Sequence, residues 1–246
     1  MKPENITIFI DDGHGSETPG KRSPGRTREN EFNRPTAVIL RKLAEDMGFN
    51  VKMVAPEIED VPLKKRTDRA NTAFKKLPGG HKAVYISIHY NAIGSDWNGA
   101  AGIETFYYTG STEGQKLAGA IQEELAKGTP QKNRGIKEAN FHVLRETLFP
   151  AVLVEGGFMT NKEEAALMKA PEFQTETAKE ILAGVCNYFG IDQKVEPEED
   201  LRRRLDREYS RRIVAEREVQ IMHDEVMRYR DFFNILEKFL NRTKGE

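Results

Sequence analysis

The sequence predicts an α/β domain with a twisted, mostly parallel central sheet, helices on both faces, and an α-helical C-terminal extension. Short apolar runs alternate with segments of helical periodicity from residue 6 to residue 189, and this alternation is typical of such a sheet. Gly48 follows the first helical segment and precedes an apolar run, as a glycine just beyond a helix end would. Polar residues follow several apolar runs, at the positions where α/β sheets bind their ligands.

Each predicted strand is a short apolar run bounded by polar or glycine residues. The strands that we expect are Ile6–Ile10, Asn50–Val54, Ala83–Ile88, Gly102–Tyr108, His142–Leu144 and Ala151–Val154. The helices are predicted from apolar residues that recur at steps of three and four. They are Asn33–Met47, Leu63–Leu77, Thr112–Lys127, Lys162–Met168 and Glu172–Phe189.

Charge density divides the chain near residue 191. Charged residues make up about 26% of residues 1–191 and about 49% of residues 192–246. We therefore expect a folded domain at 1–191 and a charged helical tail at 192–246. Seven apolar residues of the tail follow alternating steps of three and four, namely Val219, Met222, Val226, Tyr229, Phe233, Leu236 and Leu240. A coiled coil that joins two chains, a helical hairpin folded on its own domain, and a partner-binding module all remain open.

The composition excludes several classes of protein. Of the 246 residues, 38 are basic and 39 acidic, and the net charge of −1 argues against a nucleic-acid-binding protein. A single cysteine excludes a disulfide framework and a cysteine-rich zinc site. No apolar run approaches the roughly 20 residues that span a bilayer. No signal peptide is recognisable, so we expect either synthesis in the cytoplasm with lysin-type release, or a chain that has already lost its export signal.

Polar residues that can bind a metal follow three of the predicted strands or begin a helix. His14, His89 and Glu155 follow apolar runs, whereas Glu29 and Glu31 lie at a helix start. Because the carboxyl ends of parallel strands meet at one edge of a sheet, these side chains are expected to converge. Their spacing is unlike the compact pair of histidines on one helix that marks many zinc enzymes. Spacing alone therefore does not separate metal ligands from structural histidines.

Three segments resemble the zinc-dependent N-acetylmuramoyl-L-alanine amidases, which cleave peptidoglycan. They are Asp11–Gly15, Ser87–Ala92 and Pro150–Asn161, with supporting matches at Arg66–Asn71, Gly102–Tyr108 and Arg134–Ile136. The resemblance runs from Ile6 to Ile191 in the order of the family. It implies hydrolysis of the amide bond between N-acetylmuramic acid and L-alanine of the stem peptide, on the bacterial cell wall.

The resemblance also implies roles for individual residues. His14, Glu29 and His89 would hold one zinc ion per chain, and Glu155 would be the catalytic proton carrier. Glu31 competes with Glu29, but the family glutamate stands four residues before an asparagine, as Glu29 stands before Asn33. Asp11 and Asp12 are candidates for holding a histidine tautomer; for Asp11, accepting hydrogen bonds from loop amides is an equal alternative.

Other interpretations are compatible with the same residues. One is a zinc peptidase that cuts within the stem peptide, and another is a non-catalytic wall-binding or scaffolding protein. Trp97 follows His89 and is either a substrate platform or a loop anchor. Cys186 lies on the apolar face of the last helix and is expected in the core.

Overall fold

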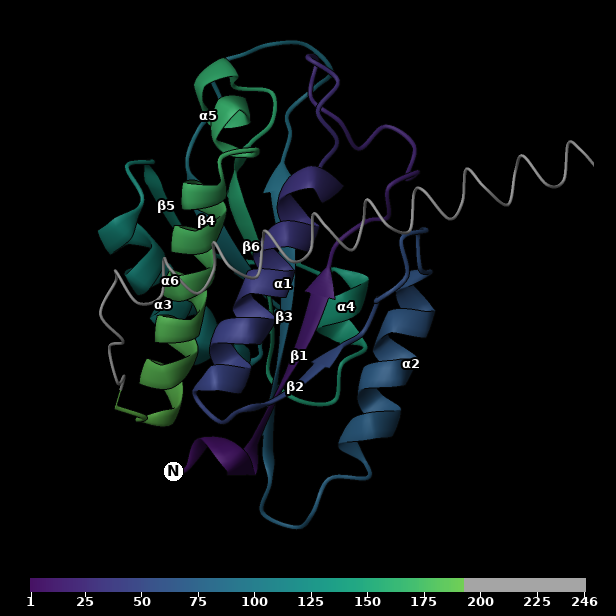
Figure 1. Ribbon diagram of the computed structural model, residues 1–246, viewed down its shortest axis with the longest axis vertical. Helices are drawn as coiled ribbons and strands as arrows, with labels where there is room; N and C mark the ends of the chain where they lie inside the picture. The colour runs from purple at the N-terminus through teal and green to yellow at the C-terminus, as the bar shows by residue number, and fades with distance from the viewer. Residues whose placement is uncertain (193–246) are drawn as a thin grey trace, which may run out of the picture. The chain divides into compact units, whose positions relative to one another are not determined.

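The computed structural model describes residues 1–192, which form a six-stranded sheet with helices on both faces (Figure 1). The strands are β1 (Ile6–Asp12), β2 (Asn50–Met53), β3 (Lys82–Asn91), β4 (Ile103–Tyr107), β5 (Asn133–Glu138) and β6 (Ala151–Phe158). The helices are η1 (Pro3–Asn5), α1 (Asn30–Asp46), α2 (Leu63–Phe74), α3 (Thr112–Gly128), α4 (His142–Arg145), α5 (Lys162–Leu167) and α6 (Pro171–Phe189). Except for Asp192, the predicted helical tail, with its possible coiled coil, lies outside the described residues.

The strand order is β2-β1-β3-β6-β4-β5. Strands β2, β1, β3 and β6 are parallel to one another, whereas β4 runs antiparallel to β6 and parallel to β5. Helices α1, α6 and α3 pack together in one layer, and α2 packs with α4 on the other face (Figure 1). The predicted α/β class with a mostly parallel sheet is confirmed. None of the helices within residues 1–192 is long and apolar enough to cross a membrane.

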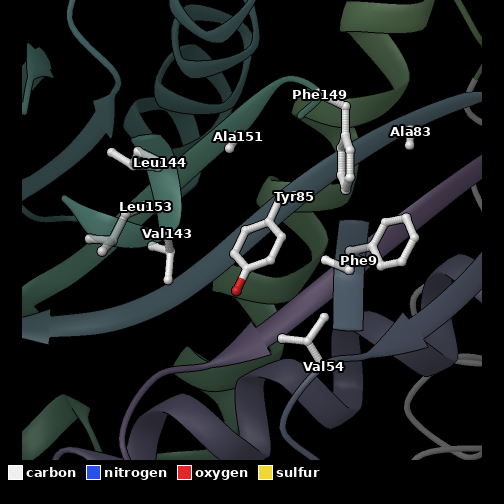
Figure 2. Close-up of a cluster of buried hydrophobic side chains, with 10 residues drawn as sticks. Phe9, Val54, Ala83, Tyr85, Val143, Leu144, Phe149, Ala151 and Leu153 are labelled. Atoms are coloured by element: carbon white, nitrogen blue, oxygen red, sulfur yellow. The ribbon is translucent and has the colours of Figure 1, made fainter. Parts of the chain in front are cut away.

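The sheet face covered by α2 and α4 changes from apolar to polar along its strands. Phe9, Tyr85 and Leu153 lie in a hydrophobic cluster with α4 (Figure 2). Side chains two residues apart on a strand share a face. The same face therefore carries Asp11 and Ser87, and then His89 and Glu155, toward the carboxyl ends of the parallel strands. The core thus supports the polar groups at one edge of the sheet.

One predicted element differs from the structure, and one strand of the structure was not predicted. His142–Leu144 was expected as a strand but forms helix α4, in which Val143 and Leu144 are both buried. Adjacent residues of a strand point to opposite faces, so a short helix lets both side chains reach the same core. Strand β5 was not predicted, because Asn133–Glu138 is a half-buried edge strand without an apolar pattern.

Candidate metal centre

Three of the predicted site residues come together at the carboxyl edge of the sheet. His14 follows β1, Glu29 immediately precedes α1, and His89 lies near the end of β3. Their potential ligand atoms all lie within 4.8 Å of one another. Glu29 Oε2 is 3.4 Å from His14 Nε2, and Glu29 Oε1 is 2.8 Å from His89 Nδ1. We call this group the His–Glu–His cluster.

Glu31, the competing carboxylate, is not part of the cluster. It accepts a hydrogen bond from the backbone N–H of Arg28 and lies 3.5 Å from Lys169 Nζ. Its side chain is 40% exposed, whereas that of Glu29 is 3% exposed. The structure therefore supports the choice of Glu29 over Glu31.

The backbone around His14 is shaped to present its ring to the cluster. His14 has a φ of 59°, in the left-handed region that non-glycine residues rarely adopt. A Cβ on Gly13 would lie 2.2 Å from the His89 ring, so only glycine leaves room for that ring. Asn33 Nδ2 donates to the Gly13 carbonyl, and Asn30 Nδ2 donates to the His14 carbonyl. The first turn of α1 thus holds the strained loop in place.

Hydrogen bonds orient the Glu29 carboxylate. Its Oε1 accepts from the Tyr90 N–H at 3.1 Å and from Asn33 Nδ2 at 3.3 Å, and it pairs with His89. Its other oxygen, Oε2, faces His14. Burial raises the pKa of Glu29, but the hydrogen bond and charge of His89, together with His14 and Tyr90, bring that pKa down to about 2. Burial lowers the pKa of His14 to about 4.

The cluster fits a divalent metal such as zinc. At neutral pH, Glu29 is ionised and His14 is neutral, which are the forms that bind a metal. Zinc in proteins takes nitrogen and oxygen ligands at about 2.0–2.1 Å, so tetrahedral ligand atoms lie about 3.3 Å apart. The 3.4 Å between Glu29 Oε2 and His14 Nε2 matches that spacing. Two imidazoles and one carboxylate leave room for a further ligand, as catalytic zinc sites do.

Glu155 lies beside the cluster, in the strand next to His89. It is the register partner of His89 on β3 and of Glu104 on β4. Its Oε2 is buried without a hydrogen-bond partner. Burial and the negative charges of Glu29 and Glu104 raise the pKa of Glu155 well above its usual value. A buried carboxylate with a raised pKa and one oxygen free of hydrogen bonds to the protein is suited to exchanging a proton with a substrate or a water molecule.

A buried ion pair between Asp11 and Arg66 stabilises the backbone next to the cluster. Asp11 accepts hydrogen bonds from Arg66 and from Ser87 Oγ, so its interpretation as a partner of a histidine is wrong. Arg66, only 2% exposed, also donates to Asp60 Oδ1 at 3.0 Å. A Cβ on Gly15 would lie 2.2 Å from the Asp60 backbone nitrogen. Arg66 therefore ties the segment around Asp60 to β1, the strand that precedes His14.

We expect Arg66→Ala to lower the free energy of unfolding by about 3–5 kcal/mol, because it leaves the Asp11 carboxylate buried without its cation. Denaturant unfolding followed by circular dichroism measures the change. Arg145→Ala removes an arginine of an exposed ion pair and should stay within about 0.5 kcal/mol of wild type. Equal stability of the two variants would contradict the structural role of Arg66.

The fold and the cluster define a class of protein, a metal-dependent hydrolase. Two histidines and a carboxylate meet at one edge of the sheet, and beside them lies a second carboxylate whose Oε2 has no hydrogen-bond partner in the protein. Residues 8–187 match the family model described as N-acetylmuramoyl-L-alanine amidase. The chain belongs to this family, and it is an amidase that cleaves the peptidoglycan of the bacterial cell wall.

Individual relatives agree with the family match. The N-acetylmuramoyl-L-alanine amidase CwlM of Bacillus licheniformis is 32% identical over 191 residues, which cover 76% of this chain and 70% of that protein. The germination-specific N-acetylmuramoyl-L-alanine amidase of Bacillus subtilis is 30% identical over 191 residues, which cover 74% of this chain and 79% of that protein. The crystal structure of an N-acetylmuramoyl-L-alanine amidase from Clostridium difficile 630 superposes with a TM-score of 0.68 at 34% identity, over 76% of this chain and 98% of that one.

Proposed function

We propose that His14, Glu29 and His89 hold one zinc ion per chain, and that Glu155 carries the proton during hydrolysis of the amide bond between N-acetylmuramic acid and L-alanine. The observation that carries the proposal is the spacing of the His–Glu–His cluster, whose ligand atoms lie within 4.8 Å of one another. The unpartnered Oε2 of Glu155 in the neighbouring strand supports the second part.

The residues divide the chemistry between them. A zinc ion bound at the cluster would supply a Lewis acid that lowers the pKa of water toward about 7 and polarises the amide carbonyl. Glu155 accepts a proton from the attacking water, whose oxygen bonds to the lactyl carbonyl carbon. As the C–N bond breaks, Glu155 gives the proton to the departing nitrogen of L-alanine. The products are a free amino group on the stem peptide and a lactyl carboxylic acid on the sugar, which keeps the second water proton until it ionises to the carboxylate at neutral pH.

Mass spectrometry of digested peptidoglycan tests the proposed reaction against its nearest alternative. Amidase activity yields intact stem peptides with a free L-alanine amino group, and glycan strands without peptide. A zinc peptidase would instead leave L-alanine attached to N-acetylmuramic acid and would release shortened peptides. Products of that second kind alone would overturn the proposal, although the His–Glu–His cluster would still be a metal site.

We also propose that the tail at residues 192–246 joins two chains. The support comes from the sequence, in which the seven apolar residues between Val219 and Leu240 form one stripe. Exposure of an apolar stripe of that length to water is unfavourable, and an isolated helix of this size is only marginally stable. Packing of the stripe against a second chain would remove both costs.

Light scattering should therefore give a mass above that of one chain for the full-length protein, and the mass of one chain for protein that ends at Ile191. The shortened protein should keep its amidase activity, because the cluster and Glu155 lie within residues 1–191. A monomeric full-length protein at micromolar concentration would contradict self-association. Loss of solubility or activity on truncation would instead support a tail that folds back on its own domain.

A further inference from the structure

Trp97 lies on one of the two loops that flank the His–Glu–His cluster and contacts the other. It belongs to the connection between β3 and β4, which begins three residues after His89. Its ring faces Gly25, where an added Cβ would be 3.1 Å from Cζ2 and 3.4 Å from Cη2. Gly25 belongs to the loop that joins His14 to Glu29. Both loops emerge at the same edge of the sheet, above β1 and β3 (Figure 1).

Hydrogen bonds within the loop that carries Trp97, and from this loop to Thr160, hold the loop in place. The Asn98 N–H donates to the Thr160 carbonyl at 2.8 Å, and Asn98 Nδ2 donates to the Ile93 carbonyl at 2.6 Å. The Ile93 N–H in turn donates to Thr160 Oγ1. Asn98, the residue after Trp97, and Thr160, in the segment after β6, thus anchor the loop. Such a loop loses little conformational entropy when a ligand binds.

The exposure of the indole is not explained by a role in packing. Trp97 remains 39% exposed, and Ile93 on the same loop is 54% exposed. Most of the large apolar side chains in residues 1–192 are buried instead. A large, rigid aromatic surface beside a catalytic site is typical of a ligand-binding surface.

We propose that Trp97 is a substrate-binding residue, and that its partly exposed indole packs on a sugar ring of the glycan strand. The inference rests on the amidase activity and on the location of the cluster. The substrate has two sides, a peptide with charged carboxylates and a glycan whose sugar rings have apolar faces. The flat face of an indole carries neither a positive charge nor a hydrogen-bond donor for a carboxylate, whereas it is complementary to the C–H face of a sugar ring. Trp97 therefore determines how the glycan side of the scissile bond is bound.

The fluorescence of wild-type protein tests this contact directly, because Trp97 is the only tryptophan in the 246-residue chain. The two reaction products serve as probes, since neither can be hydrolysed further. The disaccharide of N-acetylglucosamine and N-acetylmuramic acid should change the tryptophan emission in a saturable way. The free stem peptide should leave the emission unchanged. A response to the stem peptide alone, or no response to the disaccharide at millimolar concentration, would overturn the proposal.

Kinetics on a soluble disaccharide-peptide substrate provide the second test. Trp97→Ala should raise KM about tenfold, with kcat within about twofold of wild type, because stacking on an aromatic ring contributes to binding but not to the proton transfer. Trp97→Phe should recover most of the loss. Leu148→Ala, which shortens an exposed side chain just before the amino end of β6, should leave both constants unchanged.

The two tests separate this inference from the proposed catalytic roles. An unchanged KM in Trp97→Ala, or a fall in kcat alone, would overturn the role of Trp97. The roles of the cluster and of Glu155 would be unaffected by that result, because they are tested through metal content and kcat. Conversely, the fluorescence titration needs no turnover, so it remains decisive even if the assignment of Glu155 fails.

Discussion

Glu155→Gln is expected to lower kcat by about 10²–10⁴-fold, the usual loss when a general acid–base group is removed. The amide of glutamine has nearly the shape of the carboxylate but cannot accept the proton of the attacking water. Glu155 lies in β6, and its Oε2 makes no hydrogen bond in the protein that the substitution would break. The fold and the metal should therefore be retained. Steady-state kinetics and metal analysis of the same preparation measure both quantities.

Glu31→Gln is the matched control for this variant. Glu31 lies near Glu29 in the chain, but its side chain is 40% exposed and lies near Lys169. Its substitution should leave both kcat and metal content close to those of wild type. A Glu155→Gln enzyme within about threefold of wild type would exclude Glu155 as the proton carrier. A large loss in Glu31→Gln together with loss of the metal would favour Glu31 as the carboxylate ligand.

The strands that carry the site were predictable because each combines an apolar run with a polar end. Phe9 and Tyr85 lie in the core, whereas Asp11 and His89 follow on the same face of β1 and β3. This change from apolar to polar along one face is visible in the sequence as soon as the strands are recognised. It locates the site at the carboxyl edge of the sheet before any distance is known.

The choice between Glu29 and Glu31 was beyond the reach of sequence periodicity. Both glutamates lie at the start of α1, and only the resemblance to the family favoured Glu29. In the structure the choice depends on the Tyr90 N–H and on Asn33, which bind Glu29 Oε1. Tyr90 is 61 residues away along the chain, so no local pattern could reveal this contact.

The partners of Asp11 were mispredicted for the same reason. From the sequence, Asp11 was expected either to hold a histidine or to accept hydrogen bonds from loop amides. In the structure, Arg66 on α2, 55 residues away, donates a hydrogen bond to one oxygen of Asp11, and Ser87 donates to the other. A cation that becomes buried only when α2 packs on the sheet leaves no signal near Asp11 in the sequence.

His89→Ala is expected to reduce zinc retention by more than about 100-fold and to abolish most of the activity. Loss of a residue that merely orients a ligand already costs about 10–100-fold in metal affinity, and His89 is one of only three protein groups in the cluster. The substitution also removes the hydrogen bond between His89 Nδ1 and Glu29 Oε1. Treatment of wild-type protein with a chelator should give the same loss of activity, and added zinc should restore it.

His81→Ala is the control, because His81 directly precedes β3 and lies at the opposite end of the strand that carries His89. It should retain about one zinc per chain, as measured by elemental analysis after dialysis, and its activity should match that of wild type. The comparison separates loss of a ligand from a general disturbance of β3. Full activity in protein shown to be free of metal would contradict the assignment of the cluster. Equal zinc content in the two histidine variants would exclude His89 as a ligand, since the metal would then be held by other groups.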